Sequence, residues 1–296
     1  MRARARLGVT KPRHAFATAR ETQARGADEE VIHASFGRHY VSVSSSCSSV
    51  LRQLARNIEP MISLDPIGER AGSFRVVEAD GFLMVEEGAA PATRWGDLPS
   101  AVRGLHHALI KCFIDARPDL IWIHAGVVAF AGRALMLVGP AGQGKSTLVG
   151  ELLEWGCDYL SDEVAPIDPV TDTVIPFPVS PWKRIPTLDR VPAERLHEIP
   201  KVCVRLAPTA VSAGAVALGQ ILFLRHLPDA SGTAQLPCSR GTAVLELSRN
   251  SFNSQDSRTV ELSRLCAMLD RIDAFYLEYA QANNAARHLI QTASFA

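Results

Sequence analysis

The sequence lacks the features of several large classes of proteins. No apolar run reaches the roughly 18 residues of a membrane-spanning helix, and the chain contains no internal repeat or low-complexity tract. The 31 Lys and Arg residues equal the 31 Asp and Glu residues in number, so no overall field attracts nucleic acid or an anionic membrane. Outside the first thirty residues there is also no basic stripe with interleaved aromatic residues. We therefore expect neither a nucleic-acid partner nor a membrane.

The six cysteines lack the spacing of a metal site or a disulfide framework. They are scattered along the chain and include no C-x-x-C pair. Such thiols are typical of a reducing compartment, so we expect a cytoplasmic protein in which most of them are buried. The cysteines are Cys47, Cys112, Cys157, Cys203, Cys238 and Cys266.

The composition is that of a globular α/β protein. The chain has 296 residues, of which 47% are hydrophobic and 21% are charged, which suits one large domain or a core domain with a smaller one. Residues 1–30 are rich in Arg and Ala and lack both an apolar period and a secretory apolar stretch. We expect a disordered basic arm there, with an organelle transit segment as the alternative. Residues 31–100 predict a small N-terminal α+β part, and residues 101–296 a larger domain.

Hydrophobic periodicity predicts the individual elements. Helical spacing indicates helices over 48–58, 99–114, 259–270 and 283–292. Alternating or continuous apolar runs predict strands within 31–46, a hairpin around Asp80-Gly81, and later strands at 120–124, 126–130, 134–138, 159–167, 221–225 and 243–247.

The motif with the clearest chemical meaning is GPAGQGKST, residues 139–147. It fits the phosphate-binding pattern G-x-x-x-x-G-K-[ST] and lies between a strand-length apolar run and a helical pattern, as that motif requires. The glycines let backbone N–H groups turn toward phosphate oxygens, and the helix N-terminus adds partial positive charge. The residues expected to bind nucleotide are Gly139, Pro140, Ala141, Gly142, Gln143, Gly144, Lys145, Ser146 and Thr147.

Two side chains of this loop have specific expected roles. Lys145 would reach the β and γ phosphates, and the Ser146 hydroxyl would bind Mg²⁺. An N-K-x-D segment, which reads guanine in GTPases, does not occur. This absence argues against a GTPase switch, and the cofactors that we expect are ATP and Mg²⁺.

A histidine and an acidic pair flank the loop along the chain. His124 stands 15 residues before Gly139, and Asp162 and Glu163 follow 17 residues after Lys145. Adjacent strand side chains point to opposite faces, so only one acid could face the phosphates unless the chain bends. Asp162 suits a base that takes a proton from an attacking hydroxyl; its alternative role is a Mg²⁺ ligand.

The sequence leaves two interpretations open for Glu163 and two for His124. Glu163 is either a second metal ligand or a solvated strand residue. His124 is either catalytic or a satisfied histidine at the end of a strand. The adjacent pair His106 and His107 lacks partners at metal spacing, and we interpret it as packing and surface.

Cationic residues further along the chain could complete a phosphate site. Lys183 and Arg184 lie in a proline-bounded stretch, FPVSPWKRIP, that could offer cations to ATP or to an acidic peptide. Arg249, in ELSRNSFN, and Arg225, at the end of a predicted strand, are further candidates for contact with substrate or phosphate. For each of them, a surface or structural role is the alternative.

Taken together, residues 123–168, IHAGVVAFAGRALMLVGPAGQGKSTLVGELLEWGCDYLSDEVAPID, resemble the kinase core of HPr kinase/phosphorylase. That bacterial enzyme phosphorylates a serine of a carrier protein, and it shares its fold with phosphoenolpyruvate carboxykinase. Within this group the chain is most similar to the divergent HPr-kinase-related kinases, including those beside peptide-modification genes such as lasso-peptide clusters. The specific resemblance covers residues 120–185.

The resemblance implies a role for each matching residue. The family's catalytic histidine falls on His124, its phosphate-binding lysine on Lys145, and its metal-binding hydroxyl on Ser146. The aspartate that accepts the proton falls on Asp162, and Glu163 replaces the second aspartate of the family's pair. No match is found for the segment that binds HPr and runs the reverse reaction, so neither phosphorylase activity nor HPr is part of the expectation.

The fold class implied is α/β, a mixed-sheet P-loop kinase core of the HPr kinase/phosphoenolpyruvate carboxykinase type with a small N-terminal α+β part. The function implied is transfer of the ATP γ-phosphate to a Ser or Thr hydroxyl of a peptide or small protein, which includes a ribosomally made peptide precursor. A kinase of a small-molecule hydroxyl and a nucleotide-dependent switch without transfer are the alternatives. Assembly into a homo-oligomer stays open.

Overall fold

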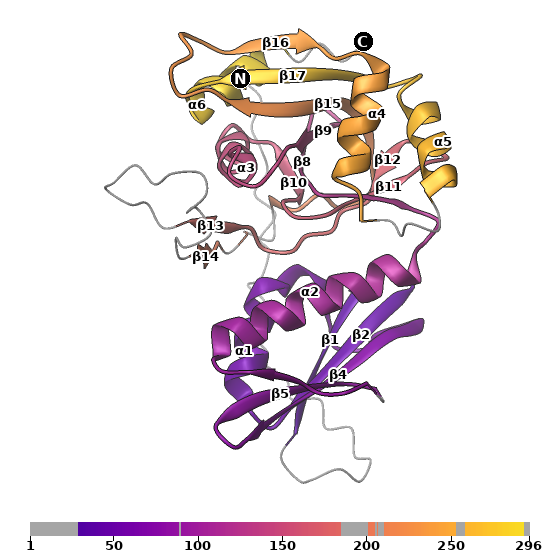
Figure 1. Ribbon diagram of the computed structural model, residues 1–296, viewed down its shortest axis with the longest axis vertical. Helices are drawn as coiled ribbons and strands as arrows, with labels where there is room; N and C mark the ends of the chain where they lie inside the picture. Colours follow the sequence, from indigo (N-terminus) through magenta and orange to yellow (C-terminus); the bar gives the residue numbers. More distant parts are fainter. Residues whose placement is uncertain are drawn as a thin grey trace, which may run out of the picture.

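The computed structural model describes residues 29–88, 90–184, 201–204, 206, 210–252 and 258–292, and the side chains of 182–184, 201–203 and 258 are outside the description. The expected basic arm lies outside the described residues except at its last positions. The described chain forms two α/β units, one above the other in Figure 1. The fold is therefore mixed α/β, as the sequence predicts.

The N-terminal unit is a sheet with its helices on one face (Figure 1). Among the described residues it has six strands, with β2 and β4 parallel and the other neighbours antiparallel. In sheet order they are β3 (Ile62–Ser63), β1 (Glu30–Phe36), β2 (His39–Ser45), β4 (Glu69–Ala79), β5 (Phe82–Glu87) and β6 (Thr93–Trp95). The helices are α1 (Ser48–Asn57), the short 3-10 helix η1 (Glu59–Met61) and α2 (Leu98–Ala116).

Local sequence accounts for these elements. Asp80 and Gly81 both have positive φ, 52° and 73°, which is the backbone of a two-residue hairpin turn and confirms the hairpin between β4 and β5. Helix α2 begins after Asp97, whose carboxylate accepts a hydrogen bond from the Ser100 N–H at 2.8 Å. That bond satisfies one of the N–H groups that the first turn leaves without an intrahelical partner.

Helix α2 packs on the N-terminal sheet, and the expected division at residue 100 falls near the start of this helix. Its buried face includes Leu105, Leu109 and Phe113 and belongs to the same core as the sheet. That core continues into the second unit through Trp122 and Phe177, whose rings lie 5.8 Å apart and both contact Phe36. Strand β1, through Phe36, and helix α1, through the Arg56 and Asn57 carbonyls that accept from Ser180, therefore both meet the second unit.

The C-terminal unit is a mixed sheet with helices on both faces. Among the described residues the sheet has nine strands: β10 (Asp158–Ser161), β8 (Ala125–Phe130), β9 (Arg133–Val138), β15 (Val216–His226), β12 (Thr173–Val174), β11 (Ala165–Asp168) and β7 (Ile121–Ile123) in order, with β17 (Asp273–Tyr279) beside β15 and β16 (Ala234–Pro237) beside β17. A separate ribbon pairs β13 (Trp182–Arg184) with β14 (Lys201–Cys203).

Each face of this sheet has its own core. Helices α3 (Lys145–Glu154) and α6 (Ala282–Thr292) cover one face, and α4 (Arg240–Arg249) and α5 (Arg258–Met268) cover the other (Figure 1). The expected helices at 259–270 and 283–292 are confirmed by α5 and α6. Strands β16 and β17 were not predicted.

Two predictions of local structure are wrong. Residues 243–247 form part of helix α4, because the Ser239 hydroxyl caps the helix by accepting from the Thr242 N–H and because Ala243 and Leu247, four residues apart, are both buried. The run 159–167 is two strands, β10 and β11, separated by a bend at the acidic pair.

Candidate functional site

Strand register brings the ends of three strands to one edge of the larger sheet. The first residue of β8 lies opposite the last residue of antiparallel β9, so His124 and Gly139 lie side by side at that edge. The last residue of β10 lies opposite the third residue of antiparallel β8, so Asp162 emerges at the same edge. The predicted loop, the histidine and the acidic pair are therefore neighbours in space.

Residues 139–147 wrap the N-terminus of α3, as the motif predicts. Gly142 and Gly144 have φ values of 95° and 82°, a left-handed backbone that favours glycine. Lys145 is the first residue of α3, and its buried ammonium donates to the Gly139 carbonyl at 2.5 Å and to the Pro140 carbonyl at 3.4 Å. Backbone N–H groups and a cation thus meet at one helix N-terminus, an arrangement that suits phosphate.

Two strands of the same unit hold the loop from behind. The Tyr279 hydroxyl in β17 donates to the Gln143 carbonyl at 2.6 Å, and the Gln143 side-chain oxygen accepts from the His226 N–H of β15 at 2.8 Å. A Cβ on Gly144 would lie 2.5 Å from the Tyr279 oxygen, so this position is closed to other residues. Burial raises the pKa of Tyr279 to about 12 and keeps it a neutral donor.

The acidic pair lies in a tight bend between β10 and β11. The Ser161 hydroxyl closes the bend by donating to the Val164 carbonyl at 2.6 Å and accepting from the Val164 N–H at 3.2 Å. A bend of this kind is the condition under which both acids could face the phosphates. In the structure the two carboxylates have different neighbours.

Asp162 is buried between β8 and α3. A Cβ built on Gly126 would lie 3.3 Å from Asp162 Oδ1 and 2.7 Å from Val149 Cγ2 of α3. The missing side chain of Gly126 therefore makes room for the Asp162 carboxylate beside the helix that carries the loop. Gly126 has no role in the sequence-based prediction. A glycine inside an apolar strand, two residues after His124, can nevertheless indicate a close approach by another part of the chain.

Glu163 points to helix α2 of the N-terminal unit. Its Oε2 lies 2.9 Å from His106 Nε2, and its Oε1 lies 3.6 Å from His107 Nε2. Burial opposes the charge of Glu163, but the hydrogen bonds and charges of the two histidines outweigh it and hold the pKa of this carboxyl well below its usual range. The interpretation of the two histidines as packing and surface missed this contact, because no local pattern connects residues so distant in sequence.

His124 is held by main-chain groups on both sides. Its Nδ1 lies 2.8 Å from the Glu163 carbonyl oxygen, and its own N–H donates to the Asn250 carbonyl at 2.7 Å. Since a carbonyl only accepts, His124 Nδ1 carries a proton and donates it to the Glu163 carbonyl. The Phe252 ring stands edge-on to the imidazole at a centroid distance of 5.9 Å.

The structure describes the side chains of only some of the cationic residues that were expected to contact substrate or phosphate. Arg249 ends helix α4 one residue before Asn250, which places its backbone close to His124, and its exposed guanidinium pairs with Glu246 at 3.3 Å. Lys183 and Arg184 lie in strand β13, and their side chains are outside the described residues. Arg225 stacks over the Tyr276 ring and pairs with Glu278 at 3.2 Å.

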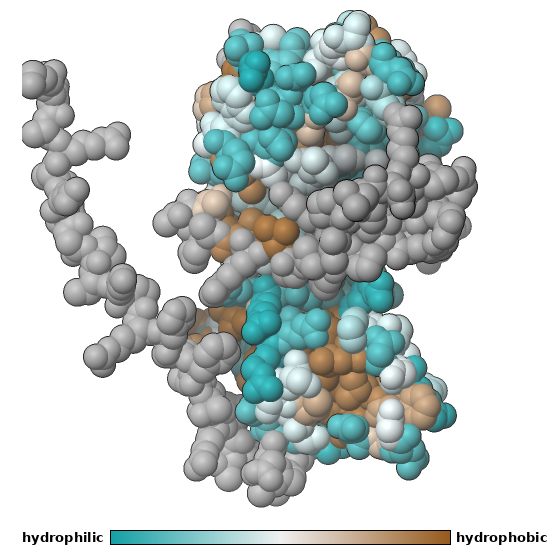
Figure 2. Space-filling view, turned by 90° about the vertical axis from the view of Figure 1, so that its left-hand side faces the viewer, coloured by the Kyte–Doolittle hydropathy of each residue, from teal (hydrophilic) through white to brown (hydrophobic). Residues whose placement is uncertain are grey.

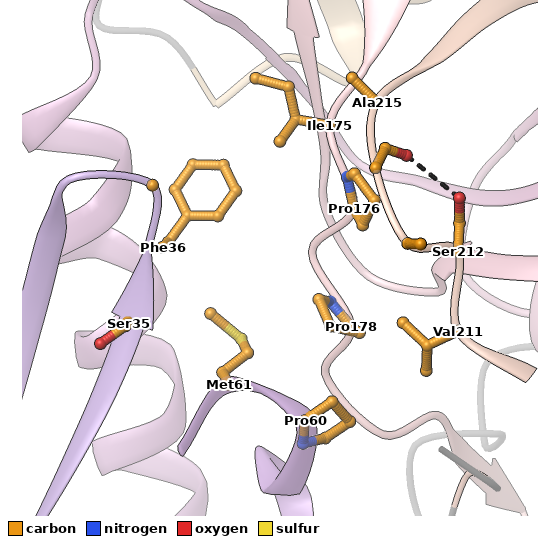
Figure 3. Close-up of a pocket in the computed structure, with 13 residues that line it drawn as sticks. Ser35, Phe36, Pro60, Met61, Ile175, Pro176, Pro178, Val211, Ser212 and Ala215 are labelled. Carbon is orange, nitrogen blue, oxygen red and sulfur yellow. Dashed lines mark hydrogen bonds between the residues drawn. The ribbon is translucent and has the colours of Figure 1, made fainter. Parts of the chain in front are cut away.

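Two hollows lie near these elements. One, of about 320 Å³, adjoins the loop and includes Gly139, Gln143, Arg225 and Glu246. The other, of about 360 Å³, lies between the two units, where Phe36 and Met61 face Ile175, Pro176 and Pro178 (Figure 3). None of the residues lining the second hollow is charged or a histidine or cysteine, so it supplies no group for acid–base or phosphate chemistry.

Within the described part of the chain, no group of three or more His, Cys, Asp or Glu side chains is arranged to hold a metal ion. The oxygen groups at this edge that could hold Mg²⁺ are the Ser146 hydroxyl and the Asp162 carboxylate. No helix in the described ranges has both the length and the apolar character needed to span a membrane.

The fold and the loop define an α/β protein with a P-loop between β9 and α3. No protein-family model and no curated protein matches the sequence. Among solved structures, the chain is similar to the HPr(Ser) kinase/phosphatase from Coxiella burnetii, with 13% sequence identity and a TM-score of 0.30, over 57% of this chain and 97% of that chain. A likeness this distant assigns neither a family nor an activity.

Proposed function

We propose that this protein is an ATP- and Mg²⁺-dependent kinase that transfers the γ-phosphate to a hydroxyl group. The observation that carries the proposal is the register of β8, β9 and β10, which sets a phosphate-binding loop, a buried aspartate and an oriented histidine along one sheet edge. A P-loop with a purely structural role would not need a buried aspartate and an oriented histidine beside it.

The loop residues fit a nucleotide triphosphate. The glycine-rich main chain and the N-terminus of α3 offer N–H groups to phosphate oxygens, and Lys145 would exchange its carbonyl contacts for the β and γ phosphates. The Ser146 hydroxyl would hold Mg²⁺ together with phosphate oxygens, and the metal would neutralise charge on the transferred group.

Asp162 is the residue we assign to proton acceptance. Its carboxylate lies beside α3 at the loop edge, and the loose transition state of phosphoryl transfer asks the protein for positioning and a modest proton transfer. His124, whose Nδ1 donates to the Glu163 carbonyl at the same edge, would assist near the γ-phosphate or the attacking oxygen.

The acceptor we propose is a Ser or Thr of a peptide or small protein, which includes a ribosomally made peptide precursor. This choice rests on the resemblance of residues 120–185 to the HPr-kinase-related kinases. A small-molecule hydroxyl and a switch without transfer are the rival outcomes. The chain's 31 basic and 31 acidic residues give no support to a nucleic-acid partner.

The test is transfer of label from γ-labelled ATP with Mg²⁺ to Ser/Thr peptides, to peptides encoded beside the gene, and to a cell extract. Transfer to a peptide that is absent in the Lys145→Ala variant would support the proposal. Label confined to small metabolites would replace the peptide acceptor by a small molecule. Tight ATP binding with no transfer to either class would leave the switch.

A further inference from the structure

The contact between Glu163 and helix α2 joins the proposed catalytic edge to the other unit of the protein. His106 is almost fully buried at 2% exposure, and its Nε2 lies 2.9 Å from Glu163 Oε2. A carboxylate only accepts, so His106 Nε2 carries the proton and donates it. Among the described residues, the buried Nδ1 of His106 has no hydrogen-bond partner, which leaves the bond to Glu163 as the polar contact that orients this ring.

The same glutamate contacts the catalytic edge through its main chain. Its carbonyl oxygen accepts from His124 Nδ1 at 2.8 Å, and the preceding residue is Asp162. A shift of the Glu163 backbone would therefore change the tautomer-setting partner of His124 and the position of Asp162 together. The Ser161 hydroxyl holds the bend through its hydrogen bonds to Val164, and the Glu163 side chain holds it through its contact with His106.

Helix α2 is a rigid support for this anchor. Residues Leu105 and Leu109, which flank the histidine pair along the helix, are buried in the core of the N-terminal unit. His107 is exposed and adds a second cation or donor 3.6 Å from Glu163 Oε1. The N-terminal unit thus supplies two side chains that hold a bend belonging to the C-terminal unit.

We propose that His106 and His107 are positioning residues for the reaction, and that Glu163 acts as their anchor and not as a metal ligand. This inference rests on the proposed function. The histidines hold Glu163, and Glu163 fixes both Asp162 and the Nδ1–H tautomer of His124 at the loop edge. Phosphoryl transfer then depends on contact between the two units of the chain.

The experiment compares His106→Leu, which removes the donor, with His106→Gln, whose amide nitrogen can reach the place of Nε2. Lys111→Ala, an exposed residue of the same helix paired with Asp115, is the matched control. We expect His106→Leu to lower kcat by roughly tenfold to a hundredfold, the cost of a misplaced catalytic group, while ATP–Mg²⁺ affinity stays within about twofold. His106→Gln should recover much of the loss, and Lys111→Ala should behave as wild type.

A spectroscopic readout separates this inference from the proposed function. Nitrogen-15 NMR of the histidine rings reports the tautomer of His124 whether or not transfer occurs. We expect the Nδ1–H form in the wild type and in His106→Gln, and a mixture in His106→Leu. Absence of transfer in the wild type would defeat the proposed function, and the His124 signals would still decide the positioning role.

Two results would overturn the inference. One is a His106→Leu variant that is folded by circular dichroism and has the kcat and the His124 signals of the Lys111→Ala control. The other is a Glu163→Gln variant whose lost activity returns at high Mg²⁺, because that rescue identifies a metal ligand. A Glu163→Gln variant with normal Mg²⁺ dependence, reduced kcat and an altered His124 tautomer supports the anchor.

Discussion

The two sides of the candidate site are held in different ways. The loop side is braced within its own unit, by Tyr279 and by the main chain of β15. The acidic side is braced across the two units, since Glu163 reaches His106 and His107 of α2. In Figure 1 the loop lies within the upper unit, whereas α2 lies on top of the lower one.

This difference indicates which side of the site depends on contact between the two units. A loop held by its own sheet keeps its shape whenever that sheet is folded. A bend held by a neighbouring helix keeps its shape only while the two units stay in contact. The described polar contacts between the units include the Glu163 link to α2 and the hydrogen bonds that Ser180 donates to the Asn57 carbonyl at 2.7 Å and to the Arg56 carbonyl at 3.2 Å. Figure 2 shows a mainly hydrophilic described surface on the upper unit and a hydrophobic patch on the lower one.

The largest effect is expected from the loop side. Lys145→Ala removes the cation at the N-terminus of α3 and should abolish transfer, with a loss of at least about a hundredfold. The fold should survive, because alanine is a good helix former at the first position of α3. Transfer by the purified variant, with its circular dichroism spectrum, is the measurement, and retention of more than about a tenth of the wild-type rate would mean that the loop is not the phosphate site.

On the acidic side, Asp162→Asn keeps the size of the side chain and removes the proton acceptor. We expect transfer to fall by roughly a hundredfold while ATP–Mg²⁺ binding persists, because Lys145, Ser146 and the loop amides are unchanged. Single-turnover transfer and nucleotide affinity across a Mg²⁺ series are measured together. Lost binding that returns with added Mg²⁺ would instead make Asp162 the metal ligand and move the proton acceptor elsewhere.

The comparison also explains which parts of the molecule the sequence could predict. The strand, loop and helix around Lys145 depend on local residues, and they were predicted with their neighbours. The partner of Glu163 lies 57 residues away, at His106, and only tertiary packing brings them together. The bend after β10 depends on Ser161, whose hydroxyl bonds to the backbone of Val164, and apolar periodicity does not report such a bond.

Strands β16 and β17 were missed for a related reason. The run 273–279, DAFYLEY, alternates, yet its meaning appears only when Leu277 and Tyr279 are seen to pack under α3 and α6. The brace from Tyr279 to the loop therefore could not be predicted from the motif alone. Residues 243–247 alone favour a strand, whereas the cap at Ser239 starts a helix that continues through them.

A smaller effect tests how closely the acidic side fits the helix of the loop. Gly126→Ala places a Cβ 2.7 Å from Val149 Cγ2 and 3.3 Å from Asp162 Oδ1, so Val149 must move. We expect a destabilisation of about 1–3 kcal/mol, typical of overpacking, and a several-fold loss of transfer. Denaturant unfolding and kinetics provide the two readouts. Gly232→Ala, where a new Cβ meets no atom within 4 Å and φ lies outside the left-handed region as it does at Gly126, is the matched control.

The smallest effect is expected from the brace behind the loop. Tyr279→Phe removes one hydrogen bond to the Gln143 carbonyl and leaves the ring packing in place, so we expect a loss of about 1 kcal/mol in stability and a weakening of ATP binding by a few-fold. Because burial raises the pKa of Tyr279 from 10 to about 12, the tyrosine ionises first in the unfolded chain. Its contribution to stability is therefore fully present below pH 10 and is lost as the pH rises through about 12. Near-ultraviolet absorbance of the wild type minus that of Tyr279→Phe follows this ionisation. A difference titration centred at the usual tyrosine pKa would show that the hydroxyl is open to solvent, and the loop would then lack the brace that distinguishes it from the acidic side.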